Sequence, residues 1–202
     1  TPQLFSSNTD SDVVQVNPDS SFSSIGLGSG SGTNGIMSSM MSTNIFYEMP
    51  SDPDLYEDQY DVVAGKWPTD YNEVLVVLTP NGNVSDFMLY SMGLRDRSEL
   101  TDMVREFSNE EEVTAPSDSM SLDYDDLLGV TFKLVNATNF YQYDSEYGVW
   151  KDKTGDTDYM RDAVNAGDDV HVVGIVKPKP ETKVSPLKVG LYYTPAMVNH
   201  LI

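Results

Sequence analysis

The stretch that decides the fold reads YDVVAGKWPTDYNEVLVVLT, from Tyr60 to Thr79. It holds two apolar runs of β-forming residues, Val62–Ala64 and Val74–Leu78, on either side of a turn and a polar step. The turn and the polar step contain Gly65, Lys66, Trp67, Pro68, Asn72 and Glu73. Gly65 is free to adopt a positive φ, and Pro68 fixes its own φ and has no N–H for a ladder. The stretch therefore predicts a strand, a rigid corner and a strand, with Gly65 at positive φ and Trp67 largely buried.

Further elements are predicted outward from this stretch by apolar periodicity and by capping residues. The expected strands are 12–16, 130–135, 170–176 and 189–193, with a hairpin over 140–150. The expected helices are 85–92, 96–108, 122–128, 157–166 and one that opens at 194–195. A Ser/Gly/Met-rich segment, residues 18–44, is expected to be a flexible loop, and the Pro/Lys segment 177–186 an extended, exposed loop. Strands and helices mix without regular βαβ alternation, so the predicted fold class is α+β.

Charge and composition exclude several classes of protein. The 202 residues carry a net charge of −20, with a pI near 4.1. Such a surface repels nucleic-acid phosphate and anionic lipid. With no cysteine, disulfides, thiolate catalysis and Cys-based zinc sites are excluded. No stretch is long and apolar enough for a membrane span and no signal peptide opens the chain, so both ends are interpreted as the boundaries of an excised segment.

The sequence predicts no catalytic, cofactor or metal site. Gly30–Gly35 matches the pattern G-x-G-x-x-G, but it lacks the preceding strand and the following helix and is interpreted as a linker. His171 and His200 lack the partners of a triad or a zinc pair and are given structural or exposed roles. The many paired acids are interpreted as solvated faces, although calcium binding stays open. The Met-rich run 37–41 is not interpreted as a Cu(I) site.

The predicted hairpin is unusually aromatic. Its aromatic residues are Tyr141, Tyr143, Tyr147 and Trp150. They form a candidate interaction surface for peptide or sugar, and cross-strand packing within a hairpin explains them equally well. Both interpretations remain open from the sequence.

Several segments, taken in order, resemble the extracytoplasmic domain of MacB/FtsX-type ABC transporter permeases, in versions from Gram-positive bacteria. The resemblance covers most of Tyr56–Ile202 and begins with Gly65–Pro68 and Asn72–Glu73. It continues through SDFMLYSMGL from Ser85, through Leu127-Leu128-Gly129 before a strand, and through His171–Lys177, which contains Gly174, followed by LYYT from Leu191. The N-terminal third is not similar to the family.

The resemblance implies a fold of two lobes. Residues 1–72 with 176–202 would form a porter-like lobe built from both chain ends, and residues 73–175 a smaller inserted α/β lobe. Both ends would return to one membrane-facing end. The residues that match the family would then be architectural: Gly65, Lys66, Trp67, Pro68, Asn72, Glu73, Gly129 and Gly174.

The resemblance also implies a function. The domain would be non-enzymatic and would lie on the extracytoplasmic face of the bacterial plasma membrane, where it transmits ATP-driven conformational change to an exported substrate or an extracellular partner. It would bind no cofactor, because a separate cytoplasmic ABC ATPase binds ATP. Its partners would be the permease's own transmembrane helices, that ATPase, a second permease copy, and a peptide, lipoprotein or cell-wall-associated protein, with no nucleic acid. The alternatives are a free-standing surface module that binds peptide or glycan, and a hydrolase with two acids in one cleft.

Overall fold

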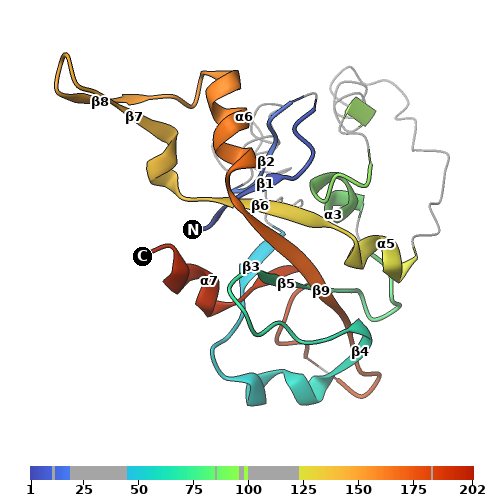
Figure 1. Ribbon diagram of the computed structural model, residues 1–202. Helices are drawn as coiled ribbons and strands as arrows, with labels where there is room; N and C mark the ends of the chain where they lie inside the picture. Colours follow the sequence, from blue (N-terminus) through green and yellow to red (C-terminus); the bar gives the residue numbers. More distant parts are fainter. Residues whose placement is uncertain (11, 19–44, 85, 96–97, 100–122, 183) are drawn as a thin grey trace, which may run out of the picture.

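A large mixed β-sheet with few helices forms the fold (Figure 1). The computed structural model describes residues 1–10, 12–18, 45–84, 86–95, 98–99, 123–182 and 184–202. Its main sheet has the order β2-β1-β6-β9-β5-β10-β3, and β4 also pairs with β9. The strands are β1 (Gln3–Ser6), β2 (Gln15–Asn17), β3 (Phe46–Glu48), β4 (Tyr60–Gly65), β5 (Glu73–Val77), β6 (Thr131–Val135), β9 (Asp168–Pro178) and β10 (Gly190–Tyr193). The chain is thus a mixed α/β protein, as its unevenly alternating elements predict.

The eleven-residue strand β9 is the centre of this sheet. On one side it pairs in parallel with β5, from His171 to Val176. On the other side it pairs antiparallel with two strands in succession, first β6 near its start and then β4 near its end. The strands β4 and β5 therefore do not pair with each other, although the corner joins them. The chain turns from one side of β9 to the other.

The sheet is covered on both faces. The alternation along β5 shows this, because Val74 and Val76 belong to one buried cluster and Leu75 and Val77 to another. All four are fully buried. A strand buried on both faces has a continuous apolar run rather than an alternating one, which explains the sequence VLVVL. Each buried aliphatic side chain contributes about 2 kcal/mol of transfer free energy.

Short α-helices lie around the sheet: α3 (Asp86–Ser91), α5 (Tyr124–Leu128), α6 (Thr157–Asn165) and α7 (Pro195–His200). The side chains of Asp156 and Thr194 accept hydrogen bonds from the backbone N–H groups of Tyr159 and Met197, so they cap α6 and α7. Gly93, at φ 74°, follows α3 and ends it. Short 3-10 helices lie at Pro53–Leu55, Glu57–Gln59 and Ala137–Phe140.

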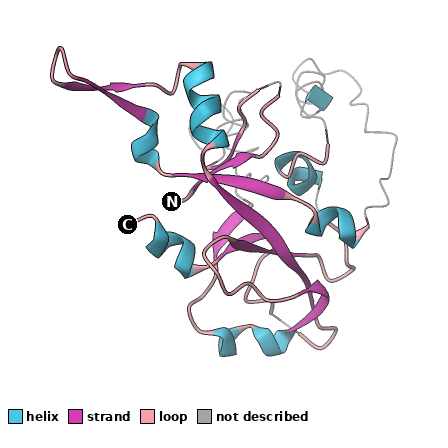
Figure 2. Cartoon of the chain, viewed as in Figure 1, coloured by secondary structure: helices cyan, strands magenta, loops and turns pink. Residues whose placement is uncertain are grey.

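The predicted hairpin forms a sheet of its own. Strands β7 (Tyr141–Asp144) and β8 (Val149–Asp152) pair only with each other, and the hairpin projects from the body beside α6 (Figure 2). Apart from Pro18, the predicted loop 18–44 lies outside the described residues. The predicted helix 96–108 also lies outside them except for residues 98–99.

Strands from both predicted lobes share the main sheet. Strands β1, β2, β3 and β4 come from the first seventy-two residues, and they join β5, β6 and β9. The predicted boundary at 175/176 falls inside β9. These boundaries therefore do not coincide with a break in the sheet, and the division into two lobes stays a prediction.

The first strand and the last helix meet at one end of the fold. In β1, Gln3 pairs with Val135 of β6. The next residue, Asn136, donates a side-chain hydrogen bond to the carbonyl oxygen of Leu201, directly after α7 (3.5 Å). Figure 1 shows both chain ends on this side of the molecule. None of the described helices is long and apolar enough to cross a membrane.

Candidate functional site

The corner, residues 66–72, crosses closely over β9 at two glycines. Gly65 and Gly174 are register partners at the end of the β4–β9 ladder. A Cβ on Gly65 would lie 2.0 Å from the carbonyl oxygen of Val173, and a Cβ on Gly174 would lie 1.9 Å from that of Lys66. Gly65 has φ 70°, which confirms the positive φ predicted from the sequence. The two glycines let the backbones approach until Lys66 N–H donates to Val173 O (2.9 Å).

Glu73 holds the corner together from inside. One carboxylate oxygen accepts from Lys66 Nζ at 2.5 Å. The other accepts from the backbone N–H groups of Thr69 (2.8 Å) and Asp70 (3.2 Å). Burial of this side chain, which is only 12% exposed, raises its pKa, but these hydrogen bonds and the charge of Lys66 outweigh burial and lower the pKa to about 2. The group is therefore an anion at neutral pH, and its hydrogen bonds fix the corner.

Trp67 is half-buried, so its side chain is more exposed than the sequence predicts. Its ring packs on Tyr56 at 5.2 Å between centroids and meets Tyr60 edge-on at 6.4 Å. The indole packs against the buried cluster to which both tyrosines belong, and it stays partly exposed. The next residue, Pro68, is buried, so the corner is anchored at two adjacent side chains.

The corner is also joined to the C-terminal helix. Thr194, the N-cap of α7, donates a hydrogen bond from its hydroxyl to Asp70 O (3.0 Å). Tyr71 stacks on His200 at the other end of α7, with ring centroids 3.8 Å apart. The same histidine lies 3.0 Å from Asp168 Oδ2, at the start of β9. His200 is exposed, as predicted, but it links α7, the corner and β9.

The remaining motif residues, Asn72 and Gly129, act through their backbone. Asn72 O accepts from His171 N–H of β9 (2.9 Å). Gly129 ends α5 with φ −75°, and its missing Cβ would lie 3.4 Å from Asp125 O. Gly129 therefore differs from Gly65, because an ordinary φ is compatible with other residues there. His171 itself is exposed and lies 3.3 Å from Thr131 Oγ1, but it pairs with both β5 and β6, so it does not lie at an edge of the sheet.

The hairpin carries an aromatic face, which we define as Tyr141, Tyr143 and Trp150. In the β7–β8 register, Tyr143 is opposite Trp150, and Tyr141 is opposite Asp152. Residues opposite each other, and residues two apart along a strand, point to the same side of a sheet, so all three rings share one side. Tyr143 and Trp150 lie 5.3 Å apart between ring centroids.

The three rings are exposed and do not join the core. The exposed fractions are 45% for Tyr141, 53% for Tyr143 and 67% for Trp150. Cross-strand packing accounts for the Tyr143–Trp150 contact, but it leaves most of the indole in solvent. Aromatic rings gathered on one exposed side of a projecting element are typical of binding surfaces.

Tyr147 does not share this face. It lies in the turn of the hairpin, where its ring contacts Lys151 Nζ at 5.5 Å. Lys151 also forms an ion pair with Asp144, and both residues belong to the opposite side of the hairpin in the register. The structure thus separates Tyr147 from the other three aromatic residues. Tyr147 lies in a turn, where side chains do not alternate between the two sides as they do along a strand. Its side of the hairpin therefore could not be predicted from the sequence, and it was grouped with the other three aromatic residues.

The base of the hairpin is fixed to the body. Phe140 packs edge-on against Phe5 of β1, with centroids 6.0 Å apart. Its carbonyl oxygen accepts from Lys153 N–H (2.8 Å), which closes the hairpin at its base. Lys153 Nζ lies over the ring of Tyr159 in α6. The aromatic face is therefore held at a defined position, although its own strands pair with each other and not with the main sheet.

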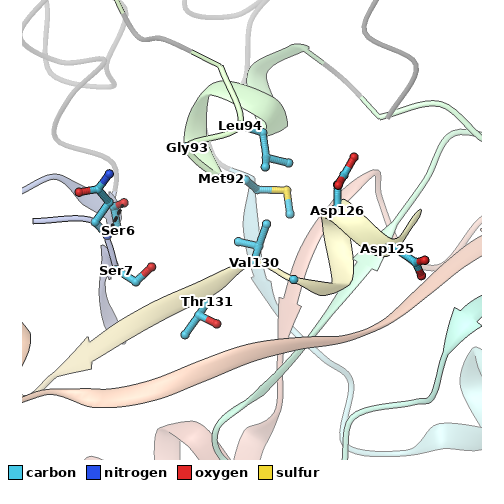
Figure 3. A pocket seen from close by; sticks show the side chains of 11 residues that line it. Ser6, Ser7, Met92, Gly93, Leu94, Asp125, Asp126, Val130 and Thr131 are labelled. Atoms are coloured by element: carbon cyan, nitrogen blue, oxygen red, sulfur yellow. Dashed lines mark hydrogen bonds between the residues drawn. The ribbon is translucent and has the colours of Figure 1, made fainter. Parts of the chain in front are cut away.

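A pocket of about 580 Å³ lies elsewhere, between the loop after β1, the end of α3 and the end of α5. Sequence reasoning did not single it out. Met92, Leu94 and Val130 form its apolar side, and Figure 3 shows their side chains gathered together. Its two acids, Asp125 and Asp126, point in different directions, and Asp125 points away from the hollow (Figure 3). No histidine lines the pocket among the described residues.

Among the described residues, no group of three potential metal-ligating side chains comes together. Comparisons of the chain with family models, with curated proteins and with solved structures find no match.

Proposed function

We propose that the chain is a non-catalytic extracytoplasmic domain of an ABC transporter permease, which passes ATP-driven movement to a substrate or partner outside the cell. The porter-like lobe with an inserted lobe belongs to the same proposal. In this function, a separate ATPase binds ATP on the cytoplasmic side, and the described residues supply a rigid body and a contact surface.

The observation that carries the proposal is that the first strand and the last helix meet beside Val135 and Asn136. A domain placed between two membrane spans needs its first and last elements at one end. The arrangement fits that need.

The contacts of α7 support transmission of movement. Helix α7 bonds the corner through Thr194 and stacks on it through His200, and the corner lies across β9 with backbones in contact at Gly65 and Gly174. Packed backbones, together with the hydrogen bonds and the ion pair of Glu73, resist continuous deformation, so a displacement of α7 would be carried into β9 as a rigid-body movement. The motif residues thus support a mechanical role rather than a chemical one.

The aromatic face supports a contact with something outside. Its three rings are exposed on a hairpin that projects from the sheet. The same observation favours a second candidate function, a free-standing surface module that binds peptide or glycan. The two candidates differ in attachment to a membrane, not in the use of the hairpin.

Site-specific labelling tests the proposal. The chain has no cysteine, so Ser145→Cys in the exposed hairpin turn places a single thiol on it. Expressed from its own gene in intact cells, this variant should react with a membrane-impermeant maleimide and stay with the membrane fraction. The gene should also encode spans on both sides of the domain and lie beside a gene for an ABC ATPase.

Two results would overturn the proposal. Labelling only after lysis would place the domain inside the cell. Labelled protein released without any membrane span would favour the free-standing module instead.

A further inference from the structure

We propose that the aromatic face binds an arginine-rich segment of a peptide or protein. This inference goes beyond the transporter proposal, because it names the chemistry of the ligand. It rests on that function only in treating the hairpin as the outward contact surface. It does not require the chain to be part of a transporter.

The aromatic face has free π-surface. Lys151 contacts the ring of Tyr147 on the opposite side of the hairpin, so a cation already lies on an aromatic ring there. On the aromatic face itself, no cation contacts Tyr143 or Trp150 among the described residues. A guanidinium group stacks on the face of tryptophan or tyrosine and is attracted by the ring quadrupole. A cation from a partner can therefore stack on these rings, because no cation of the described residues already does so.

An anion lies on the same side of the hairpin as the aromatic face. Asp152 is the register partner of Tyr141. Its Oδ1 accepts from the N–H and the hydroxyl of Thr154, at 2.8 and 2.7 Å. These bonds lower the pKa of Asp152 and keep it ionised, while Oδ2 has no hydrogen-bond partner in the described part of the chain. A guanidinium that stacks on the rings would find an acceptor beside them.

The net charge of the whole chain also favours a cationic ligand. A net charge of −20 attracts cationic segments and raises their rate of encounter. It repels anionic lipid, nucleic acid and a second copy of the chain. A neutral glycan would gain nothing from this charge. Charge complementarity therefore favours a basic segment over the other occupants that stack on aromatic rings.

The test uses the 202-residue chain and fluorescein-labelled peptides of equal length that alternate glycine with arginine, lysine or glutamine. Fluorescence anisotropy should show binding in the order arginine, lysine, glutamine, with the arginine peptide weakened about tenfold between about 50 mM and about 300 mM NaCl. The double variant Tyr143→Ala/Trp150→Ala should weaken the arginine peptide about tenfold or more.

A matched control lies on the same two strands. The double variant Gln142→Ala/Val149→Ala removes two exposed side chains from the opposite side of the hairpin and should bind like the unmodified chain. Circular dichroism and thermal melting of both variants check that each one folds. Because both pairs are exposed, loss of binding can be separated from loss of structure.

Four outcomes would overturn the inference. Equal binding by the Tyr143→Ala/Trp150→Ala variant would show general charge attraction only, and equal loss in the control variant would show that the face is not special. Ring-dependent binding of an N-acetylglucosamine oligosaccharide, or of vesicles of phosphatidylcholine with phosphatidylglycerol, without binding of the arginine peptide would assign another ligand. Ring-dependent dimerisation in sedimentation would assign a second copy. None of these results bears on the labelling test, so the transporter proposal fails or stands separately.

Discussion

Replacing Glu73 by glutamine keeps the shape of the side chain and removes its charge, so the change isolates what that charge contributes to the corner. The pKa of Glu73 is about 2 in the folded chain, against an ordinary 4.5. A carboxyl group whose pKa is lower in the folded chain stabilises the fold above its unfolded pKa. That contribution is lost as the pH falls from about 4.5 toward about 2.

The size of the effect follows from the two pKa values. The interval from 4.5 to about 2 corresponds to about 3 kcal/mol of unfolding free energy at neutral pH. The side chain of Lys66 is 57% exposed, so solvent screens its part of the interaction. We therefore expect Glu73→Gln to lower the free energy of unfolding by about 2 kcal/mol near neutral pH.

Urea unfolding of both proteins at two pH values measures this. Many acids titrate over the same range, so the useful quantity is the difference between the unmodified chain and Glu73→Gln. That difference should be about 2 kcal/mol near pH 7 and below about 1 kcal/mol near pH 2.5. Glu146→Gln, at an exposed turn position, should change stability by less than about 0.5 kcal/mol. A Glu73→Gln loss that is equal at the two pH values would refute the reasoning.

Three further changes test other parts of the structure by chemical denaturation. Gly174→Ala should lower the free energy of unfolding by about 2 kcal/mol or more, because its Cβ would overlap Lys66 O. Gly155→Ala has open space around it and should be nearly neutral, so equal effects of the two variants would contradict the close approach of the corner to β9. Tyr60→Phe should cost about 1–3 kcal/mol, because the buried hydroxyl both donates to and accepts from the backbone of Leu187 at 2.9 Å; a neutral result would argue against these bonds. Trp150→Ala should change stability by less than about 0.5 kcal/mol, since the ring is 67% exposed, and a larger loss would place the ring in a packed contact.

Local patterns were sufficient for most individual elements. The run Val74–Leu78 predicts a strand, and β5 confirms it. Glycine and proline signals at Gly93 and Pro195 correctly mark a helix end and a helix start. These features depend on neighbouring residues, so the sequence contains the information directly.

Pairings between distant segments could not be predicted in this way. The four residues of β1 carry no period of their own and form a strand because β2 and β6 supply partners on both sides. Strand β9 extends through Lys177 and Pro178, which were predicted as a loop, because β4 pairs along it as far as Tyr60. A proline at the end of a strand is tolerated, since no further ladder hydrogen bond is needed there.

The candidate site shows the same limit. The aromatic residues of the hairpin were found from composition, but the separation of Tyr147 from the other three follows from the turn, which fixes its side independently of strand alternation. The contact between Gly65 and Gly174 joins residues far apart in the chain, so only the three-dimensional structure shows that β9 passes under the corner.

The position of β9 in the chain has a consequence for how the protein is made. It is the strand on which β4, β5 and β6 all pair, yet it follows every one of them in the sequence. While a ribosome synthesises the chain, these three strands emerge with nothing to pair against along their β9 edges, and about a hundred residues separate β4 from the partner it needs. We expect the nascent chain to remain open until residue 178 has emerged, with the apolar run of β5 exposed to aggregation until then.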